Sequence, residues 1–189
     1  MAPSRAELEA AADRVLADVA APGLRVLFSG INPGLYSAWS GHHFARPGNR
    51  FWPALHRSGF TPRQLRPDEQ QELLTLGLGI TNVVARASAR ADELSPAEVL
   101  AGGEALRAKV RRLQPRWLGV LGVTVYRRAF ATPRAVVGPQ EPRPDLPLDL
   151  RLGETRVWVL PNPSGLNAHW SAAALAEELS RLREAADGS

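Results

Sequence analysis

The stretch Arg25-Val26-Leu27-Phe28-Ser29-Gly30-Ile31-Asn32-Pro33-Gly34 joins an apolar run to a polar turn. Residues 24–30 are mostly aliphatic or aromatic and end in glycine, which predicts a buried strand. Proline fixes its own φ and moves the preceding residue out of the helical region, while glycine permits positive φ, so Asn32-Pro33-Gly34 predicts a turn. We therefore expect Asn32, in an extended conformation, at the carboxyl end of a strand. In an open parallel sheet, that end is where ligands bind.

Outward from this stretch, apolar runs alternate with segments of helical periodicity. Three further runs predict buried strands, at 79–84, Trp117–Leu121 and Arg156–Leu160. The segments that predict helices are 4–20, 49–58, 61–76 with an interruption near Pro67, 95–113, 122–130 and 171–185. The clearest start is Ser95-Pro96-Ala97-Glu98, because it combines an N-cap, a proline at the first helical position and a capping-box glutamate.

Strands that alternate with helices predict an α/β fold, in which helices cover both faces of a mostly parallel sheet. The loops that follow such strands meet at one edge, so we expect 31–48, 85–94 and 161–170 to be neighbours there. The proline-rich span Thr132–Gly153 predicts a surface loop. No internal repeat or linker divides the chain, and residues 1–189 are expected to form a single domain.

Composition limits the class of protein. A chain of 189 residues that is 44% hydrophobic suits one ordinary core. Lys+Arg 23 against Asp+Glu 19 gives a net charge of +4, a weak indication of a polyanionic partner. Lys109 is the only lysine. Arginine suits bidentate phosphate contacts, but the same bias fits a GC-rich genome equally well.

Missing residue types exclude several kinds of chemistry. Without cysteine, the chain can form no disulfide, thiolate nucleophile, cysteine zinc site or iron–sulfur cluster. Residues 1–20 lack an apolar signal core, and no apolar run approaches the ~18 residues that a spanning helix needs. We therefore expect an intracellular, cytoplasmic protein.

The sequence also lacks the motifs of the common enzyme classes. Neither a dinucleotide-binding glycine fingerprint nor a phosphate-binding loop is present. Ser164 lacks the spacing of a hydrolase nucleophile elbow, and the adjacent His42 and His43 are poorly spaced as ligands of one metal. What remains is a pocket of backbone turns, asparagines, an aromatic side chain and arginines.

Such a pocket suits a planar polar group, because an aromatic side chain can stack on a base while amides read its edge. Phe44 is the candidate for stacking, although it could equally be a core residue. Asn32 is the candidate amide, although its side chain could equally bond only its own backbone.

Three segments stand out together: Gly30-Ile31-Asn32-Pro33-Gly34; Gly41-His42-His43-Phe44 with Pro47-Gly48-Asn49-Arg50-Phe51-Trp52; and Leu160-Pro161-Asn162-Pro163-Ser164-Gly165-Leu166. In this order they resemble the signature segments of the mismatch-specific uracil-DNA glycosylases, the group that includes thymine-DNA glycosylase. The resemblance implies a three-layer α/β/α sandwich around a four-stranded, mostly parallel sheet. It also implies hydrolysis of the N-glycosidic bond of uracil or thymine mispaired with guanine in double-stranded DNA. No cofactor is expected.

The resemblance also assigns roles to residues. Asn32 matches the asparagine that holds the attacking water, and Phe44 the aromatic that stacks on the flipped base. The other residues expected to line the base pocket are Gly30, Ile31, Pro33, Gly34 and Ser37. The residues expected on the loop that enters the duplex are Asn162, Pro163, Ser164, Gly165, Leu166 and Asn167. The family often has an arginine two residues after this leucine, where the present chain has Ala168.

Asn32 raises a chemical question, because an amide can orient water but cannot usefully take its proton. We therefore expect a dissociative path, in which uracil leaves as an anion and positioned water captures an oxocarbenium-like sugar. Asp92 offers a carboxylate on the expected rim that could activate water, although a solvated loop acid is the simpler interpretation.

Two other functions stay open from the sequence alone. A DNA-binding module could keep this fold and lack the chemistry, and a nucleosidase would act on free nucleosides. Lys109 falls within an expected helix, which argues against a Schiff-base lyase step. The leading expectation is a monomeric, monofunctional DNA glycosylase associated with the nucleoid.

Overall fold

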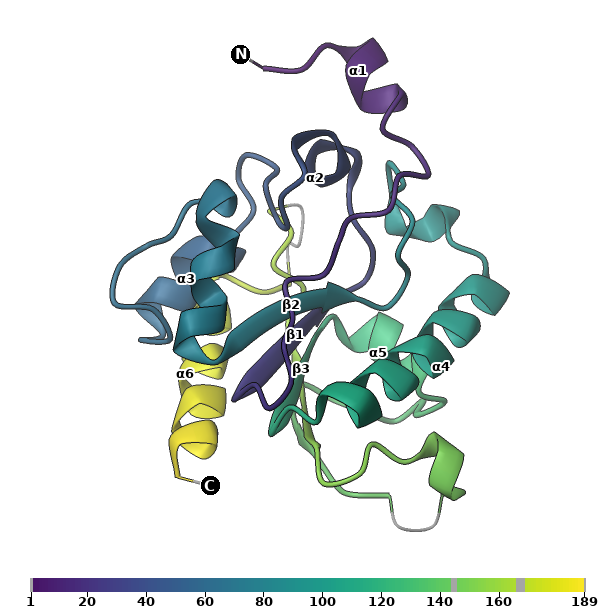
Figure 1. Ribbon diagram of the computed structural model, residues 1–189, viewed down its shortest axis with the longest axis vertical. Helices are drawn as coiled ribbons and strands as arrows, with labels where there is room; N and C mark the ends of the chain where they lie inside the picture. The colour runs from purple at the N-terminus through teal and green to yellow at the C-terminus, as the bar shows by residue number, and fades with distance from the viewer. Residues whose placement is uncertain (1, 144–145, 166–168, 189) are drawn as a thin grey trace.

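The computed structural model describes residues 2–143, 146–165 and 169–188, with the backbone alone described at Asp149. Its sheet has five strands in the order β2-β1-β3-β5-β4 (Figure 1). The strands are β1 Val26–Gly30, β2 Leu78–Asn82, β3 Trp117–Leu121, β4 Gly138–Gln140 and β5 Arg156–Leu160. Neighbouring strands pair in parallel except for β4, which is antiparallel to β5. The expected α/β class and mostly parallel sheet are confirmed, with five strands rather than four.

Helices form a layer on each face of the sheet. The α-helices are α1 Arg5–Glu9, α2 Leu35–Ser40, α3 Phe51–Arg57, α4 Pro96–Leu113, α5 Val123–Ala129 and α6 Ala172–Asp187. The 3₁₀ segments are η1 Pro67–Leu76, η2 Ala91–Glu93 and η3 Leu148–Leu150. Figure 1 shows α3 and α6 together on one side of the sheet and α4 and α5 on the other. No helix in the described part of the chain is long and apolar enough to cross a membrane.

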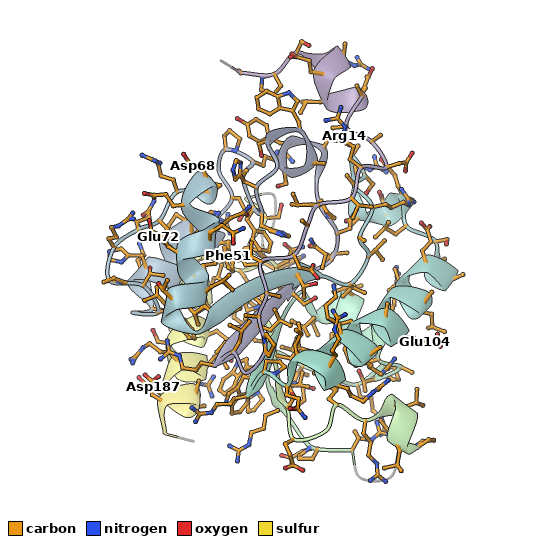
Figure 2. All side chains as sticks on the ribbon, viewed as in Figure 1. Arg14, Phe51, Asp68, Glu72, Glu104 and Asp187 are labelled. Carbon is orange, nitrogen blue, oxygen red and sulfur yellow. The ribbon has the colours of Figure 1, made fainter. Side chains whose placement is uncertain are left out.

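Alternating side chains of the strands supply two cores. Phe28 of β1 belongs to the cluster that also contains Phe51 of α3 and Leu179 of α6. Its neighbour Leu27 belongs to the cluster beneath α4. Successive residues of a strand point to opposite faces, so a strand buried on both faces is apolar without alternation. Figure 2 shows the labelled carboxylates Glu72, Glu104 and Asp187 at the periphery of the molecule.

The helix expected over 4–20 is wrong beyond its first turns. The Ser4 capping box is present, but α1 ends at Glu9, and Asp13 has a left-handed φ of 62°. Farther along, Val19 exchanges backbone hydrogen bonds of 2.9 and 2.7 Å with Ile80 of β2. This segment covers the edge of β2, which would otherwise expose unpaired backbone groups. Pairing with the sheet edge thus overrides the helical periodicity.

Three other segments differ from expectation. The 31–48 loop contains α2, and the proline-rich span contains β4, where Pro139 is tolerated because β4 is an edge strand. The segment 61–76 is helical only over η1, as a 3₁₀ helix. The Ser95 capping box is confirmed at the start of α4, where the Ser95 side chain accepts from the Glu98 backbone N–H.

Candidate active site at the carboxyl edge of the sheet

The carboxyl ends of β1 and β2 lie side by side, in register from Val26–Leu78 to Gly30–Asn82. Beyond them, the Ser88 N–H donates to the Pro33 carbonyl at 3.1 Å, and the Val84 N–H donates to that of Ile31 at 2.9 Å. The turn after β1 and the loop after β2 therefore form one rim, as the parallel sheet predicts.

Asn32 uses its amide nitrogen to bind this second loop. Its Nδ2 donates to the Ser88 hydroxyl at 2.8 Å and to the Arg86 carbonyl at 3.1 Å. The amide therefore does not bond only its own backbone. Within the described part of the chain, no hydrogen-bond donor reaches Asn32 Oδ1, and the side chain is partly exposed. The side chain is thus held by its nitrogen, with its oxygen left as an acceptor for a water molecule or a ligand.

Gly30 lets two side chains approach the end of β1 closely. A Cβ at Gly30 would lie 2.5 Å from Asn82 Oδ1 and 3.2 Å from Phe44 Cζ, so both groups pack against the backbone where another residue would place its side chain. Phe44 is partly exposed, and its ring stacks on Phe51 with centroids 4.3 Å apart (Phe51 is labelled in Figure 2). The ring of Phe44 therefore packs on the core with one face and remains partly accessible.

Asn82 is a further candidate for the site that the sequence alone did not single out. Only 8% of it is exposed, and its Nδ2 lies 3.4 Å from Nδ1 of His43. The signal was present, because Asn82 ends its strand at the same edge as the turn of Asn32. It was hidden because 79–84 was assigned to a strand as a whole, whereas β2 ends at Asn82.

The remaining pocket candidates have different environments. The Ser37 hydroxyl is buried and accepts from the Ala45 N–H at 3.2 Å, so it positions the chain next to Phe44. Ile31 packs with the core cluster beneath α4 and α5. Pro33 is buried, and Gly34 is exposed at the start of α2. Of these four, Ser37 is the one tied by a hydrogen bond to the chain beside Phe44.

The loop after β5 lies against the residues that precede α3. The Arg50 N–H donates to the Pro163 carbonyl at 2.9 Å, and its guanidinium donates to the carbonyls of Gly165 and Trp170 at 3.2 and 2.6 Å. Asn162 Oδ1 accepts from the Ser164 N–H at 3.0 Å, which closes a turn. Leu166 and Asn167, expected to enter the duplex, lie outside the described residues.

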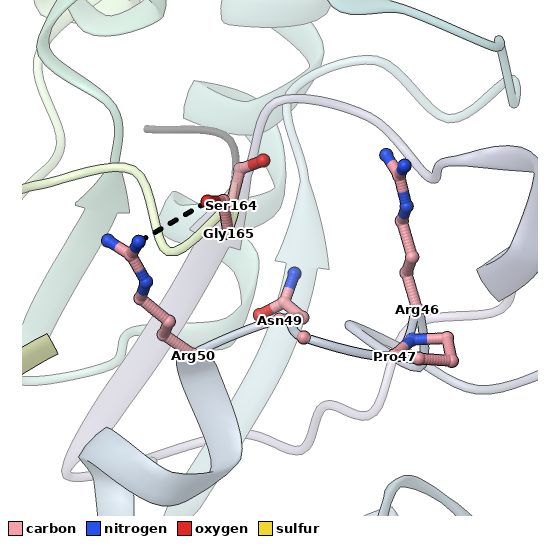
Figure 3. Close-up of a pocket in the computed structure, with 7 residues that line it drawn as sticks. Arg46, Pro47, Asn49, Arg50, Ser164 and Gly165 are labelled. Atoms are coloured by element: carbon pink, nitrogen blue, oxygen red, sulfur yellow. Dashed lines mark hydrogen bonds between the residues drawn. The ribbon is translucent and has the colours of Figure 1, made fainter. Parts of the chain in front are cut away.

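A cavity of about 330 Å³ lies beside the contact between these two segments and is lined by residues of both (Figure 3). It is lined by Arg46, Pro47, Gly48, Asn49, Arg50, Ser164 and Gly165. Within 2–143, 146–165 and 169–188, the Arg46 guanidinium makes no hydrogen bond or ion pair, and Arg46 is exposed. A cationic side chain is thus available for an anion at this edge of the sheet.

Comparison with known proteins identifies the family. The model of the uracil DNA glycosylase superfamily matches residues 17–186, nearly the whole chain. The protein belongs to the uracil DNA glycosylase superfamily. A solution NMR structure titled a putative uracil DNA glycosylase from Methanosarcina acetivorans is similar in fold, with a TM-score of 0.56 and 17% sequence identity. The match covers 90% of the present chain and 98% of that chain.

In a member of the uracil DNA glycosylase superfamily, a carboxylate close to Asn32 could activate the attacking water. Asp92 lies on the exposed segment η2 and accepts two hydrogen bonds from the Arg90 guanidinium, at 2.9 and 2.7 Å. These bonds lower the pKa of Asp92, which makes its carboxylate a weaker base. Asn32 contacts Arg86 and Ser88 of this loop instead, and a role for Asp92 in catalysis stays a prediction.

The Lys109 side chain is held by a carboxylate and a hydroxyl group. Its Nζ lies 2.5 Å from Asp18 Oδ2 and donates to the Thr81 hydroxyl at 2.8 Å. The Thr81 hydroxyl in turn donates to Asp18 Oδ1 at 2.7 Å. The sole lysine therefore fastens the segment before β1 to β2.

Proposed function

We propose that the protein is a monofunctional DNA glycosylase that removes uracil from G:U mispairs in double-stranded DNA and leaves an abasic site. Membership of the uracil DNA glycosylase superfamily supports glycosylase activity on DNA. The observation that carries the finer proposal is the anchored amide of Asn32. Its nitrogen is bonded to Arg86 and Ser88, while its oxygen is left to accept from water at the carboxyl edge of the sheet.

The proposed chemistry is hydrolysis through a late attack by water. Asn32 supplies no base, so the glycosidic bond breaks first and the electron pair leaves with the base as an anion. Water held at Asn32 Oδ1 then adds to the oxocarbenium-like sugar carbon and loses a proton to solvent. Because no strong nucleophile assists the departure of the base, turnover is expected to be slow.

The pocket walls have separate proposed roles. Phe44 stacks on the base that has left the helix, and the carboxamide of Asn82 bonds its polar edge. Extraction of a base from the duplex costs a few kcal/mol and least at a mismatch, which favours G:U and G:T pairs as substrates. We propose that Leu166 fills the space that the base leaves.

Hydrolysis, rather than β-elimination through an enzyme amine, is favoured by the environment of Lys109. Its ammonium is paired with Asp18 and donates a hydrogen bond to Thr81 of β2. An amine so held lacks the freedom to attack the sugar. We therefore propose that the protein has glycosylase activity without a lyase step. We also expect it to act as a monomer.

The proposal is tested with a duplex that carries one G:U pair, incubated with enzyme in excess and then cleaved with alkali at abasic sites. The wild-type chain is expected to give cleavage. Asn32→Ala is expected to lose about 100- to 1000-fold in single-turnover rate, because it removes the group that positions the water. Circular dichroism and the affinity for DNA should remain unchanged.

Near-normal rates for Asn32→Ala would contradict the proposed role of this residue. Binding of the duplex without cleavage by the wild-type chain would instead indicate a DNA-binding module. Excision from free nucleosides would indicate a nucleosidase. A panel of substrates that carry uracil, thymine or a damaged pyrimidine, opposite each base or in single strands, would define which bases the protein excises.

A further inference from the structure

A second cavity, of about 590 Å³, lies at the amino edge of the sheet, where β3 and β5 begin. One wall is the segment that joins α4 to β3, and the other is the segment that leads into β5. Three arginines border it, Arg111, Arg116 and Arg156, against one carboxylate, that of Glu154. Its volume falls within the range of about 300–1,000 Å³ that is typical of ligand pockets. The proposed base pocket is at the opposite edge of the sheet, so the proposed excision does not use this cavity.

Hydrogen bonds hold the two walls of this cavity in place. The Thr155 hydroxyl donates to the Pro115 carbonyl at 2.6 Å, which joins one wall to the other. At the end of α4, the Arg111 guanidinium donates to the Arg151 carbonyl at 3.1 Å. The cavity is therefore a preformed feature of the fold, and a ligand would bind there with little ordering of the chain.

Two of the three arginines are not neutralised by the fold. Arg116 and Arg156 are exposed, and neither guanidinium makes a hydrogen bond or an ion pair within residues 2–143, 146–165 and 169–188. The Arg156 guanidinium carbon lies over the Trp117 ring, 5.6 Å from the ring centroid. A guanidinium on an aromatic ring keeps its N–H groups for a further acceptor. Both side chains are thus available to pair with the carboxylates of a ligand.

The other lining residues indicate which kind of anion fits. Pro115 and Trp117 are buried and Leu152 is partly exposed, so the cavity also offers apolar contact. Glu154 is exposed and makes no ion pair within the described part of the chain, so its carboxylate can accept from N–H donors but would repel a phosphate. A nucleic acid backbone carries negative charge and gives Glu154 no donor. An acidic peptide combines carboxylates, backbone N–H groups and apolar side chains.

We propose that this cavity binds an acidic, partly apolar peptide segment of a partner protein. Carboxylates of the peptide pair with Arg116 and Arg156, an apolar side chain packs on Leu152, and backbone N–H groups donate to Glu154. Because β3 and β5 have 5 residues each, at about 3.3 Å per residue they place roughly 16 Å between this cavity and the carboxyl edge. DNA at the base pocket and the peptide at this cavity can therefore be bound together.

The test uses a fluorescently labelled peptide of alternating aspartate and leucine, titrated with the full chain and followed by fluorescence anisotropy. The wild-type protein should bind it more tightly than a matched peptide of alternating asparagine and leucine, which lacks the charge. Arg116→Ala and Arg156→Ala should each weaken binding of the aspartate peptide about 10-fold, the loss expected for one hydrogen bond between charged groups.

Arg57→Ala is the matched control, because it removes the same charge from an exposed arginine at the end of α3. Its affinity for the aspartate peptide should stay within about twofold of wild type. Equal weakening by all three variants, or equal affinity for the two peptides, would mean that no specific site binds the carboxylates and would overturn the proposal. So would the absence of any binding to wild type.

A duplex of normal base pairs distinguishes a peptide site from a second DNA surface. Saturating amounts of this duplex should leave the labelled peptide bound. Displacement of the peptide by the duplex would overturn the proposal and indicate a nucleic-acid surface at the amino edge instead.

Backbone amide signals locate the bound peptide. On addition of the aspartate peptide, the ¹⁵N–¹H signals of Gly153 and Thr155 should shift, while those of Gly34 and Phe44 at the carboxyl edge should not. The reverse pattern would place the peptide at the base pocket and refute the inference. No step of this test measures excision, so its outcome does not depend on the proposed glycosylase activity.

Discussion

The strand ends of β1 and β2 and the strand end of β5 are held in different ways. At β1 and β2, asparagine side chains bond groups inside the fold: Asn32 to Ser88 and Arg86, and Asn82 to His43. At β5, a cationic side chain reaches across from a neighbouring segment, because Arg50 donates to the carbonyls of Gly165 and Trp170.

This difference separates two tasks. Groups that act on the reacting atoms must be held within a fraction of an ångström, which buried partners achieve. A surface that meets the phosphate backbone needs charge more than exact placement, since such contacts are electrostatic and independent of sequence. Changes at β1 and β2 should therefore alter the rate of bond cleavage, and changes beside the β5 loop should alter affinity.

Among these variants, Gly30→Ala should cause the largest loss in the rate of uracil excision. The new Cβ would meet Asn82 Oδ1 at 2.5 Å and Phe44 Cζ at 3.2 Å, so both side chains would have to move away from the end of β1. A displacement of about 1 Å can cost on the order of 100-fold in rate, and we expect at least this loss in single-turnover excision of uracil.

Gly34→Ala is the matched control for this variant, because a Cβ there has no atom within 4 Å. Its rate should stay within about threefold of wild type, as expected for a surface substitution. Similar losses in the two glycine variants would mean that the turn as a whole, rather than the pocket at Gly30, limits the reaction.

Arg46→Ala should have an intermediate effect, confined to binding. Its side chain borders the cavity beside the β5 loop and is expected to contact one phosphate. The variant should bind duplex DNA more weakly, and the slope of log affinity against log salt should fall by about 1, while the single-turnover rate at saturation stays unchanged.

Arg116→Ala serves as the control of equal charge, because Arg116 precedes β3 at the opposite edge of the sheet. Its salt slope should match that of wild type. A reduced slope for both variants would show that DNA contacts are spread over the molecule, which would weaken the assigned division between the two regions.

Asp92→Ala and Asp92→Asn should have the smallest effect. The carboxylate is exposed, bonded to Arg90, and has a lowered pKa, so it remains charged and weakly basic at neutral pH. Both variants should excise uracil within about twofold of wild type, as expected for a surface substitution. A much slower reaction in both would place a general base in the site and replace the dissociative path proposed for Asn32.

Much of the fold was predictable because its strands are continuously apolar. The β1, β3 and β5 strands match expected runs closely, since burial on both faces makes most of their positions apolar. The segment 10–20 was not predictable in the same way. Its apolar residues fit a helix, and only the exposed edge of β2 makes an extended conformation more favourable there.

The sequence by itself determined that Asn32 ends a strand in a turn, because proline and glycine restrict the backbone locally. Only the tertiary structure decided which groups surround that residue. Ser88 anchors the Asn32 amide from 56 residues away, and His43 meets Asn82 across 39 residues. Such pairs leave no periodic signal, because a hydrogen bond depends on the position and direction of two groups that only the packed sheet brings together.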